Sequence, residues 1–285
     1  MKKKPIKASI AGTAHKRARS FSAKEMKRYE ETKAYRDQSI AWLLPTRGTV
    51  PIQVVDSWDA LQWPMNQFRT SRLSAVGMEV GAAYNLLTRI VTDRKTATEV
   101  LGSKEYADMV LGCRFVLTTE EDNVLPPDGI QKLLTAIYTC PDCGREVGVH
   151  CAGKKRQCKQ CSEWRCEKGH KGYDAVAGLY AVKADPPIPM AFGDPKKGPN
   201  DFKPRSVMRA YKAAKVLEVN GIPMGFSLFR KDMFRQMSKP WFQTSQGHTQ
   251  DLFACKKAKR EFGARFAVHC GVVVGHLHTD TGKMT

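Results

Sequence analysis

The sequence predicts an α/β protein built on a mainly parallel sheet. Apolar runs of strand length alternate with stripes at helical spacing between Ile40 and His278. With 285 residues, 42% of them hydrophobic, the chain is long enough to bury a sizeable core. No run approaches the roughly 18 apolar residues of a membrane helix, so no membrane span is expected.

The first half shows three strand signals and three helix signals. IAWLLP, from Ile40, reads as a buried strand, and IQVVDSWDAL reads as a short helix with Pro51 at its first position. MNQFRT predicts a second short strand, and GMEVGAAYNLLTRIV predicts a helix with Val80, Tyr84 and Leu87 on one face. CRFVLTT and DGIQKLLTAIY predict the next strand and helix.

The second half resumes the same rhythm after a cysteine-rich stretch. AVAGLYAV, KVLEV and GFSLFR predict strands, DLFACKKAKREFG predicts a helix ended by Gly263, and RFAVHCGVVVGHL predicts a terminal strand region. The Pro/Gly/Lys-rich residues 185–205 are too polar and too long for core, and two readings stay open: a mobile loop or a loop built around a ligand. The expected parts are a basic extension over 1–38 with a helix after Ser22, an α/β domain in two halves over 39–139 and 172–285, and an insertion over 140–171.

Most of the net charge of +19 falls on three segments. Lys and Arg outnumber Asp and Glu by twelve to four in residues 1–37, by eight to four in 140–171 and by seven to one in 195–215, which leaves +1 for the rest. This placement favours a polyanionic partner such as nucleic acid, with an anionic membrane surface as the competing reading. The basic amino terminus has no apolar run like that of a secretory signal, so we expect a cytoplasmic protein with reduced cysteines.

The insertion carries metal-ligand spacing. Two C-x-x-C pairs, Cys140/Cys143 and Cys158/Cys161, predict a structural Zn²⁺ held by four thiolates. A closed site of this kind has no open coordination position, so it should hold structure and do no chemistry. A second zinc remains open, with His150, Cys151, Cys166 and His170 as its candidate ligands.

Carboxylates cluster directly after the third strand, as Glu120, Glu121 and Asp122. Ligands of open α/β sheets bind at the carboxyl ends of strands, so this loop is a candidate site. From Ile40 to His278, apart from the insertion, the chain resembles the GT-A glycosyltransferases. The similar segments, in order, are LLPTRG, FVLTTEEDNVLPPDG, GLYAV, GIPMGFSLFRKDMF with the following PWF, and TQDLFACKKAKREFGARFAVHCGVVVGHLH.

The resemblance implies a GT-A, Rossmann-like fold with an inserted zinc-ribbon module. Residues 39–139 would be the nucleotide-sugar-binding half and residues 172–285 the acceptor-side half. It also implies a Mn²⁺ or Mg²⁺ ion that stabilises the pyrophosphate of a UDP-sugar, held by Asp122 and His276, with His278 as the alternative to His276. Glu120 stands where the family has the first aspartate of its D-x-D motif, which departs from the pattern.

The remaining predicted site residues follow from the same resemblance. Asp251, at the start of a helix, would be the base that takes the acceptor proton; the alternative is that it only caps that helix. The chain has Gln250-Asp251 where family members often have Glu-Asp. The nucleotide-sugar would contact Thr46, Arg47, Glu79, Asn85, Glu120 and Glu121.

Two basic segments lie between the acidic loop and Asp251, on the expected acceptor side. With them, the chain is most similar to phage-type DNA glycosyltransferases associated with methylpyrimidine dioxygenases. That resemblance implies hexosyl or pentosyl transfer to a hydroxymethylated pyrimidine, such as 5-hydroxymethylcytosine, in DNA. Two alternatives stay open: a GT-A enzyme acting on a saccharide or lipid-linked envelope acceptor, and a non-catalytic zinc-ribbon protein that binds nucleic acid. No oligomeric state follows from the sequence.

Overall fold

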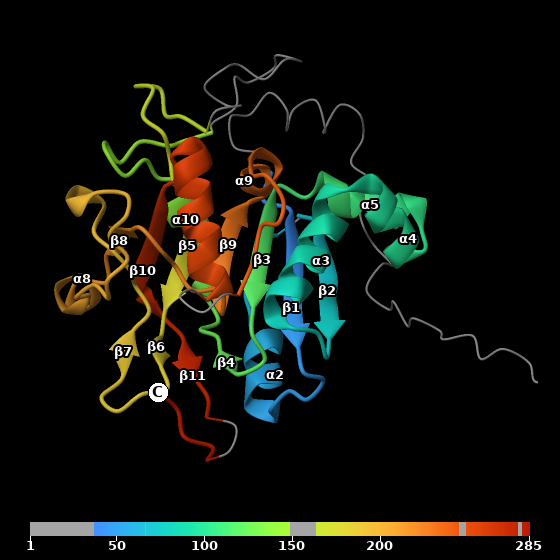
Figure 1. Ribbon diagram of the computed structural model, residues 1–285, viewed down its shortest axis with the longest axis horizontal. Helices are drawn as coiled ribbons and strands as arrows, with labels where there is room; N and C mark the ends of the chain where they lie inside the picture. Colours follow the sequence, from blue (N-terminus) through green and yellow to red (C-terminus); the bar gives the residue numbers. More distant parts are fainter. Residues whose placement is uncertain (1–36, 66, 149–163, 245–248, 279–280) are drawn as a thin grey trace, which may run out of the picture.

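A seven-stranded sheet forms the centre of the computed structural model, which describes residues 37–65, 67–148, 164–244, 249–278 and 281–285 (Figure 1). The predicted helix of the basic extension lies outside these residues. The sheet strands, in spatial order, are β2 (Arg69–Val76), β1 (Ile40–Thr46), β3 (Phe115–Thr119), β9 (Phe226–Arg230), β5 (Ala175–Leu179), β10 (Phe266–Val273) and β8 (Val216–Val219).

Five of these strands run in one direction. β1 is parallel to β2 and β3, and β5 is parallel to β10, whereas β9 is antiparallel to both β3 and β5, and β8 is antiparallel to β10. Every residue of β9 is buried, as expected for a central strand covered on both faces. The predicted α/β class with a mainly parallel sheet is therefore confirmed.

Helices cover both faces of the sheet. One core forms between the sheet and α3 (Val80–Thr92), α9 (Lys231–Gln236) and α10 (Gln250–Phe262), which lie together in Figure 1. The opposite core takes side chains from α2 (Ile52–Asp59) and α6 (Gly129–Ile137). None of the described helices is long and apolar enough to cross a membrane.

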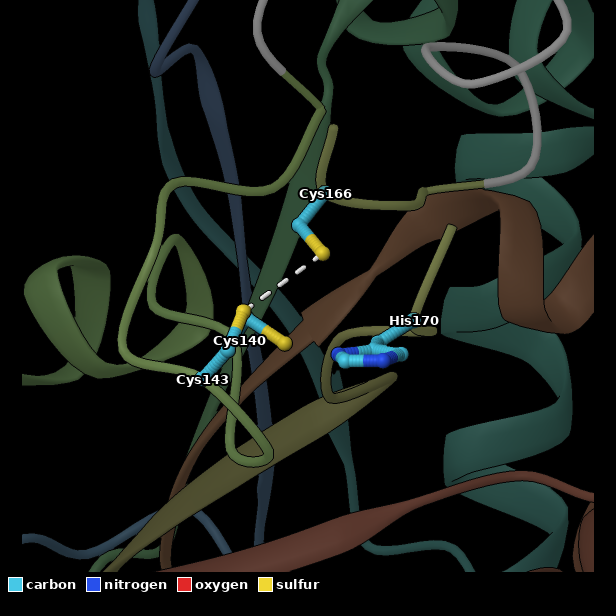
Figure 2. Close-up of side chains that lie close together, drawn as sticks. All are labelled: Cys140, Cys143, Cys166 and His170. Atoms are coloured by element: carbon cyan, nitrogen blue, oxygen red, sulfur yellow. Dashed lines mark hydrogen bonds between the residues drawn. The ribbon is translucent and has the colours of Figure 1, made fainter. Parts of the chain in front are cut away.

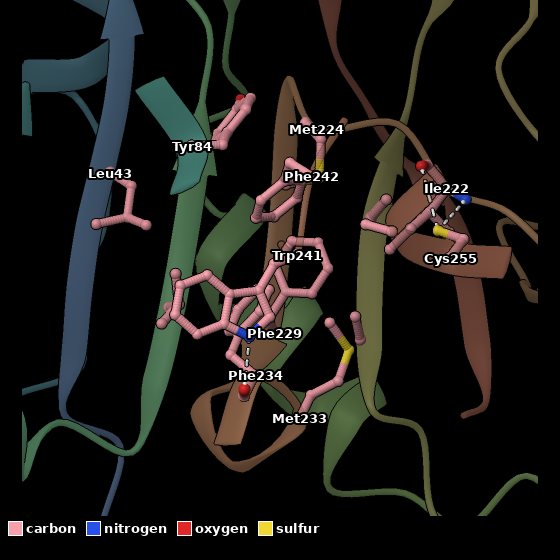
Figure 3. Close-up of a cluster of buried hydrophobic side chains, with 14 of the residues drawn as sticks. Leu43, Tyr84, Ile222, Met224, Phe229, Met233, Phe234, Trp241, Phe242 and Cys255 are labelled. Carbon is pink, nitrogen blue, oxygen red and sulfur yellow. Dashed lines mark hydrogen bonds between the residues drawn. The ribbon is translucent and has the colours of Figure 1, made fainter. Parts of the chain in front are cut away.

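The first core is rich in aromatic rings (Figure 3). Phe234 packs between Phe229 of β9 and Phe242, with ring centroids 5.4 and 5.8 Å away, and Tyr84 of α3 lies 5.2 Å from Phe242. The Trp241 indole donates to the Phe234 carbonyl over 2.7 Å, which satisfies its polar atom inside the core. This cluster joins α3 and α9 to the centre of the sheet.

Three elements depart from the expected pattern. Residues 94–101 and 104–112 form α4 (Arg94–Leu101) and α5 (Lys104–Gly112), for which we predicted no element. The second strand begins at Arg69, near the end of MNQFRT, and continues to Val76. It lies at the sheet edge and exposes every polar residue except Thr70, so its sequence lacks the apolar run of an interior strand.

The loop over residues 185–205 is held by its own hydrogen bonds and by one buried side chain. The Asn220 amide donates to the carbonyls of Gly198 and Asp201, each over 2.8 Å, and the Gly193 amide donates to Lys203 over 2.8 Å. Gly193 has φ +76, and a Cβ there would collide with the Asp201 carbonyl, so only glycine fits. The segment also contains β7 (Ile188–Pro189), paired with β6 (Ala181–Val182), and the short helix η1 (Pro195–Lys197).

Candidate functional site

A cleft lies at the carboxyl ends of β1 and β3. Because these neighbouring strands are parallel, Thr46 and the acidic loop that follows Thr119 reach the same edge of the sheet. The residues that line the cleft are Pro45, Thr46, Arg47, Met78, Val80, Glu120, Glu121 and Asp122. The structure thus brings the predicted first loop and the predicted acidic loop together.

Glu121 binds the first loop. Its carboxylate accepts from the Thr46 hydroxyl over 2.5 Å and from the Arg47 amide over 2.7 Å, and it pairs with the Arg47 guanidinium. Burial acts to raise the pKa of Glu121, but these hydrogen bonds outweigh it and lower the pKa. The carboxylate therefore stays ionised and connects the acidic loop to the loop after β1.

Asp122 faces two nitrogen groups. Its Oδ2 lies 2.6 Å from the Lys183 ammonium and 3.3 Å from Nε2 of His276. Burial opposes ionisation, yet the hydrogen bonds from His276 and Lys183 lower the Asp122 pKa to about 2. The predicted pair of Asp122 and His276 is thus brought together, whereas His278 bonds the Thr285 hydroxyl over 2.6 Å.

The orientation of His276 follows from its second nitrogen. Nδ1 lies 2.8 Å from the Ala181 carbonyl, which can only accept, so Nδ1 carries the proton. Nε2 can donate to the Asp122 carboxylate only when both ring nitrogens carry protons; in the neutral ring its lone pair, on the side of Asp122, is available to a cation. His276 is held there by β11 (Gly275–His276), which pairs with β4 (Asn123–Val124) directly after the acidic loop. A carboxylate oxygen and an imidazole nitrogen side by side are a donor pair suited to a divalent cation.

Glu120 lies on the inner side of the loop. It accepts a long hydrogen bond, 3.5 Å, from the hydroxyl of Tyr84 on α3. Burial, followed by the negative charges of Asp122 and Asp251, raises the Glu120 pKa to about 8. The Glu120 carboxyl thus experiences the charge of Asp251, although 131 positions separate the two residues in the sequence.

Asp251 is buried in the first turn of α10 and only 4% exposed. Its Oδ1 accepts from the Leu252 amide over 2.8 Å and from the Thr249 hydroxyl. Burial raises its pKa, against the effect of these two bonds. The N-cap position belongs to Thr249, which makes no side-chain cap hydrogen bond, whereas Asp251 accepts the Leu252 amide of the first turn, so the capping alternative stays open.

Glu79 and Asn85 have structural contacts in place of the cleft positions that we predicted. Glu79 caps α3 by accepting from the amides of Gly81 and Ala82 and also accepts from Thr244. The Asn85 amide donates to the Phe242 carbonyl over 2.6 Å and accepts from the amides of Trp241 and Phe242. Both residues tie α3 to the segment after α9, and neither lines the cleft.

A second group of ligand-type side chains lies in the insertion (Figure 2). Cys140, Cys143, Cys166 and His170 place one ligand atom each within 4.8 Å of all the others. Two tight turns present them: the Gly144 amide donates to Cys140, and the Gly169 amide donates to Cys166. Three thiols and one imidazole at this spacing match the ligand set of a structural zinc site.

An orphaned atom supports a metal in this group. Nδ1 of His170 is buried and has no hydrogen-bond partner in the part of the chain that the structure describes. Such an atom is costly to bury unless it binds a ligand, and Zn²⁺ accepts the imidazole lone pair. The residues therefore fit zinc, with all four ligands supplied by the protein.

The ligand pairing differs from our prediction. We expected Cys158 and Cys161 beside Cys140 and Cys143, and we assigned Cys166 and His170 to a possible second ion. The structure instead places Cys166 and His170 beside the first C-x-x-C pair, because residues 147 and 166 pair as an antiparallel bridge. The four other candidates, His150, Cys151, Cys158 and Cys161, lie outside the described residues.

Sequence reasoning missed three side chains of the cleft region. Lys183 contacts Asp122, Tyr84 contacts Glu120, and Tyr180 packs its ring 5.4 Å from that of His276. Tyr84 was predicted only as an apolar position of its helix, and a lone lysine after GLYAV carries no motif. Their roles depend on contacts between segments distant in sequence.

Comparison with known proteins identifies a fold only. No protein family and no curated protein matches the sequence. Among solved structures, the crystal structure of A197 from STIV is similar, with a TM-score of 0.50 and 14% sequence identity over 86% of this chain and 92% of that chain. At this identity the likeness supports the Rossmann-like α/β architecture and carries no statement about activity.

Proposed function

We propose that the chain is a metal-dependent glycosyltransferase of the GT-A fold that moves a sugar from a UDP-sugar to a hydroxyl acceptor. The observation that carries the proposal is the contact of Asp122 with His276 next to the buried Glu120, whose carboxyl experiences the charges of both Asp122 and Asp251. These residues come from three separate segments of the chain: the acidic loop, β11 and α10. Sugar transfer needs a site for the pyrophosphate and a base for the acceptor hydroxyl, and this group supplies candidates for both.

Asp122 and His276 are the residues that would hold Mn²⁺ or Mg²⁺. The Asp122 carboxylate is the hard oxygen donor, and Nε2 of His276 offers its lone pair on the same side. The bound cation would neutralise charge on the departing pyrophosphate. Thr46 and Arg47 line the neighbouring part of the cleft, so we assign the β1 side to the nucleotide.

Asp251 would remove the proton from the attacking hydroxyl. A raised pKa makes its carboxylate a stronger base, and the Leu252 amide and the Thr249 hydroxyl orient it. Inverting transfer is the stereochemical course that a single base of this kind serves. Glu120, whose pKa is raised by burial and by the charges of Asp122 and Asp251, would set the local charge and orient the donor sugar.

The preferred acceptor is a hydroxymethylated pyrimidine base in DNA. The clustering of the positive charge on three segments, two of them on the acceptor half or beside it, supports a polyanionic acceptor. The second candidate function, a non-catalytic nucleic-acid-binding protein, is favoured by the Cys140/Cys143/Cys166/His170 group, because zinc modules also read nucleic acid without chemistry.

The test incubates the protein with Mn²⁺, a panel of UDP-sugars and DNA that contains hydroxymethylcytosine, and then measures nucleoside masses. We expect a hexose or pentose adduct that requires the cation and is lost in Asp122→Ala. Asp59→Ala, which removes an exposed carboxylate of α2, is the control and should keep activity. Transfer to glycan without any transfer to DNA would establish the envelope alternative, and DNA binding without donor turnover would establish the binding protein.

A further inference from the structure

Residues 195–215 form a surface that we call the basic flank. It contains six exposed cationic side chains: Lys196, Lys197, Lys203, Arg209, Lys212 and Lys215. The segment lies along β8, the edge strand of the sheet, and includes η1 and α8 (Met208–Lys212) (Figure 1). Within the described residues, no carboxylate forms an ion pair with any of the six.

The acidic residues of this region are used internally. Asp201 accepts from the backbone amides of Asp194 and Lys203, and Asp194 accepts from the Lys196 amide and pairs with Arg205. Arg205, the seventh cation, also donates to the Glu218 carbonyl. The carboxylates of Asp194 and Asp201 therefore stabilise the loop conformation. The six cationic side chains remain exposed at its surface, without an ion pair among the described residues.

In the described residues, the hydrogen bonds that hold the flank in place do not use the side chains of those six residues. The Asn220 amide binds two carbonyls of the loop, as described above, and the Arg205 amide donates to the Ala191 carbonyl over 2.8 Å. A phosphate backbone that meets this surface would therefore find its charges on an ordered segment. Binding to an ordered segment costs less conformational entropy than binding to a segment that must first become ordered.

Two exposed apolar side chains lie among the charges on α8. Met208 is 59% exposed and Tyr211 is 48% exposed. Tyr211 offers a flat ring for stacking on a base or packing against a sugar. The exposed apolar surface is too small to insert into a bilayer as amphipathic helices do, so the chemistry favours nucleic acid over a membrane.

The flank also adjoins the helix that carries Asp251. Phe202 of the flank and Leu252 of α10 both cover Gly221, and the Lys256 ammonium lies 4.9 Å from the Phe202 ring. Leu252 directly follows Asp251 in the first turn of α10. A polyanion on the flank would thus lie next to the element that presents the proposed base.

From these observations we propose that the basic flank binds the phosphate backbone of duplex DNA and docks the acceptor beside Asp251. This inference rests on the proposed function for the identity of the acceptor. Arg209 and Lys212, three positions apart on α8, would each contact a phosphate, and Tyr211 would contact a sugar or an unstacked base.

The test measures binding of the full chain to a fluorescein-labelled duplex by anisotropy across a salt series. The double variant Arg209→Gln/Lys212→Gln should reduce the slope of log K against log salt by about 2, since each lost phosphate contact removes about 0.9. The matched control is Lys95→Gln/Lys104→Gln, which removes the same charge from exposed positions of α4 and α5; these helices pack with α3 beside β1 and β2, away from the β8 edge, so the slope should change less. Equal effects in both variants would overturn the proposal, because they would show a response to net charge alone.

Two further arms identify the partner and separate this inference from the proposed function. Tyr211→Ala should weaken DNA binding about tenfold with the salt slope unchanged, and Tyr211→Phe should restore it. Binding of the flank to phosphatidylserine vesicles or to heparin, but not to DNA, would overturn the assignment. Donor hydrolysis with Mn²⁺ and UDP-sugar should persist in all flank variants; its absence from the wild-type protein would refute the proposed function and leave the DNA-binding result standing.

Discussion

Neighbouring carboxylates of the acidic loop have opposite electrostatic environments. Glu121 turns toward Thr46 and Arg47, whose hydrogen bonds lower its pKa, whereas Glu120 turns inward and its pKa rises to about 8. The difference arises because consecutive side chains at the end of a strand point to opposite sides. The Glu121 carboxylate therefore binds the first loop, at Thr46 and Arg47. The pKa of the Glu120 carboxyl instead depends on burial and on the negative charges around it.

Asp251→Asn should stabilise the protein and abolish transfer. Because the folded-state pKa of Asp251 is raised, the folded state binds its proton more tightly than the unfolded state does, and the ionised group costs stability at neutral pH. This cost disappears as the pH falls below the ordinary pKa of aspartate. We therefore expect a higher Tm for the variant at pH 7, a smaller gain in acid, and a loss of about 10²-fold or more in transfer rate.

Asp59→Asn is the matched control for this stability measurement. Asp59 is exposed on α2, and its neutralisation should leave Tm nearly unchanged. A fall in Tm for Asp251→Asn at pH 7 would contradict the prediction, since it would show that the ionised carboxylate contributes favourable contacts that exceed its burial cost.

Lys183→Met should strengthen Mn²⁺ binding. The ammonium of Lys183 lies 2.6 Å from the Asp122 oxygen that would bind the ion, so it competes for that oxygen and repels a cation. A unit charge at about 4 Å contributes roughly 1–4 kcal/mol at surface dielectric values, so we expect binding at least about fivefold tighter. Titration of free Mn²⁺ by electron paramagnetic resonance measures this affinity in the absence of substrate.

The exposed Lys95 of α4 supplies the control variant Lys95→Met, which should leave Mn²⁺ affinity within twofold. Unchanged or weaker binding in Lys183→Met would contradict the proposed position of the ion. It would indicate that Lys183 itself is the cationic group of the site.

At the scale of elements, local signals predicted the long amphipathic segments. α3 and α10 form where the apolar spacing and Gly263 predicted them, and β3 and β9 form where apolar runs predicted buried strands. The start signals of α4 and α5 are also present, as the N-caps Asp93 and Ser103, and Gly102 ends α4. Those helices were missed because few of their residues are buried, which weakens the apolar stripe.

The two turns of the insertion lead to a prediction about zinc. Cys166→Ser should remove the ion bound by Cys140, Cys143, Cys166 and His170 and should lower Tm, because thiolate ligation stabilises the folded module. Metal content of the purified variant, measured by inductively coupled plasma mass spectrometry, should fall by one zinc per chain relative to the wild type.

Cys158→Ser distinguishes the observed ligand set from the one expected from spacing. If zinc bound by the first C-x-x-C pair depends on Cys158 and is retained in Cys166→Ser, the Cys₃His assignment is wrong. The spacing could not decide between the two sets, since each Cys-x-x-Cys pair needs a partner pair and the insertion holds several.

At the scale of the whole molecule, Trp164 packs the described part of the insertion against the α/β domain. Its ring is fully buried, 6.1 Å from the ring of Phe115 and 5.2 Å from that of Tyr138, with the Arg230 guanidinium 4.4 Å away. Gly172 approaches so closely that a Cβ would lie 2.8 Å from the indole. The described residues of the insertion, among them Cys140, Val147 and Cys166, are therefore part of the core on the α2 and α6 side of the sheet.

Trp164→Ala should consequently destabilise the entire protein by about 3–5 kcal/mol, the range for a large buried aromatic side chain. Trp63→Ala, which truncates a half-buried indole beside Arg69, should cost less. Urea unfolding followed by circular dichroism measures both values. Loss of the insertion alone, with an unchanged transition for the rest of the protein, would contradict this view.

The sequence by itself determined the α/β class, most strands and helices, and the residue types of the two sites. Periodicity and turn residues act locally, so they can be read without knowledge of distant contacts. Tertiary structure alone decided which residues meet: Cys166 and His170 beside Cys140 and Cys143, Lys183 on Asp122, and Asn85 as a tie between segments. These pairings depend on strand order and on the antiparallel insertion of β9 and β8, which no local pattern encodes.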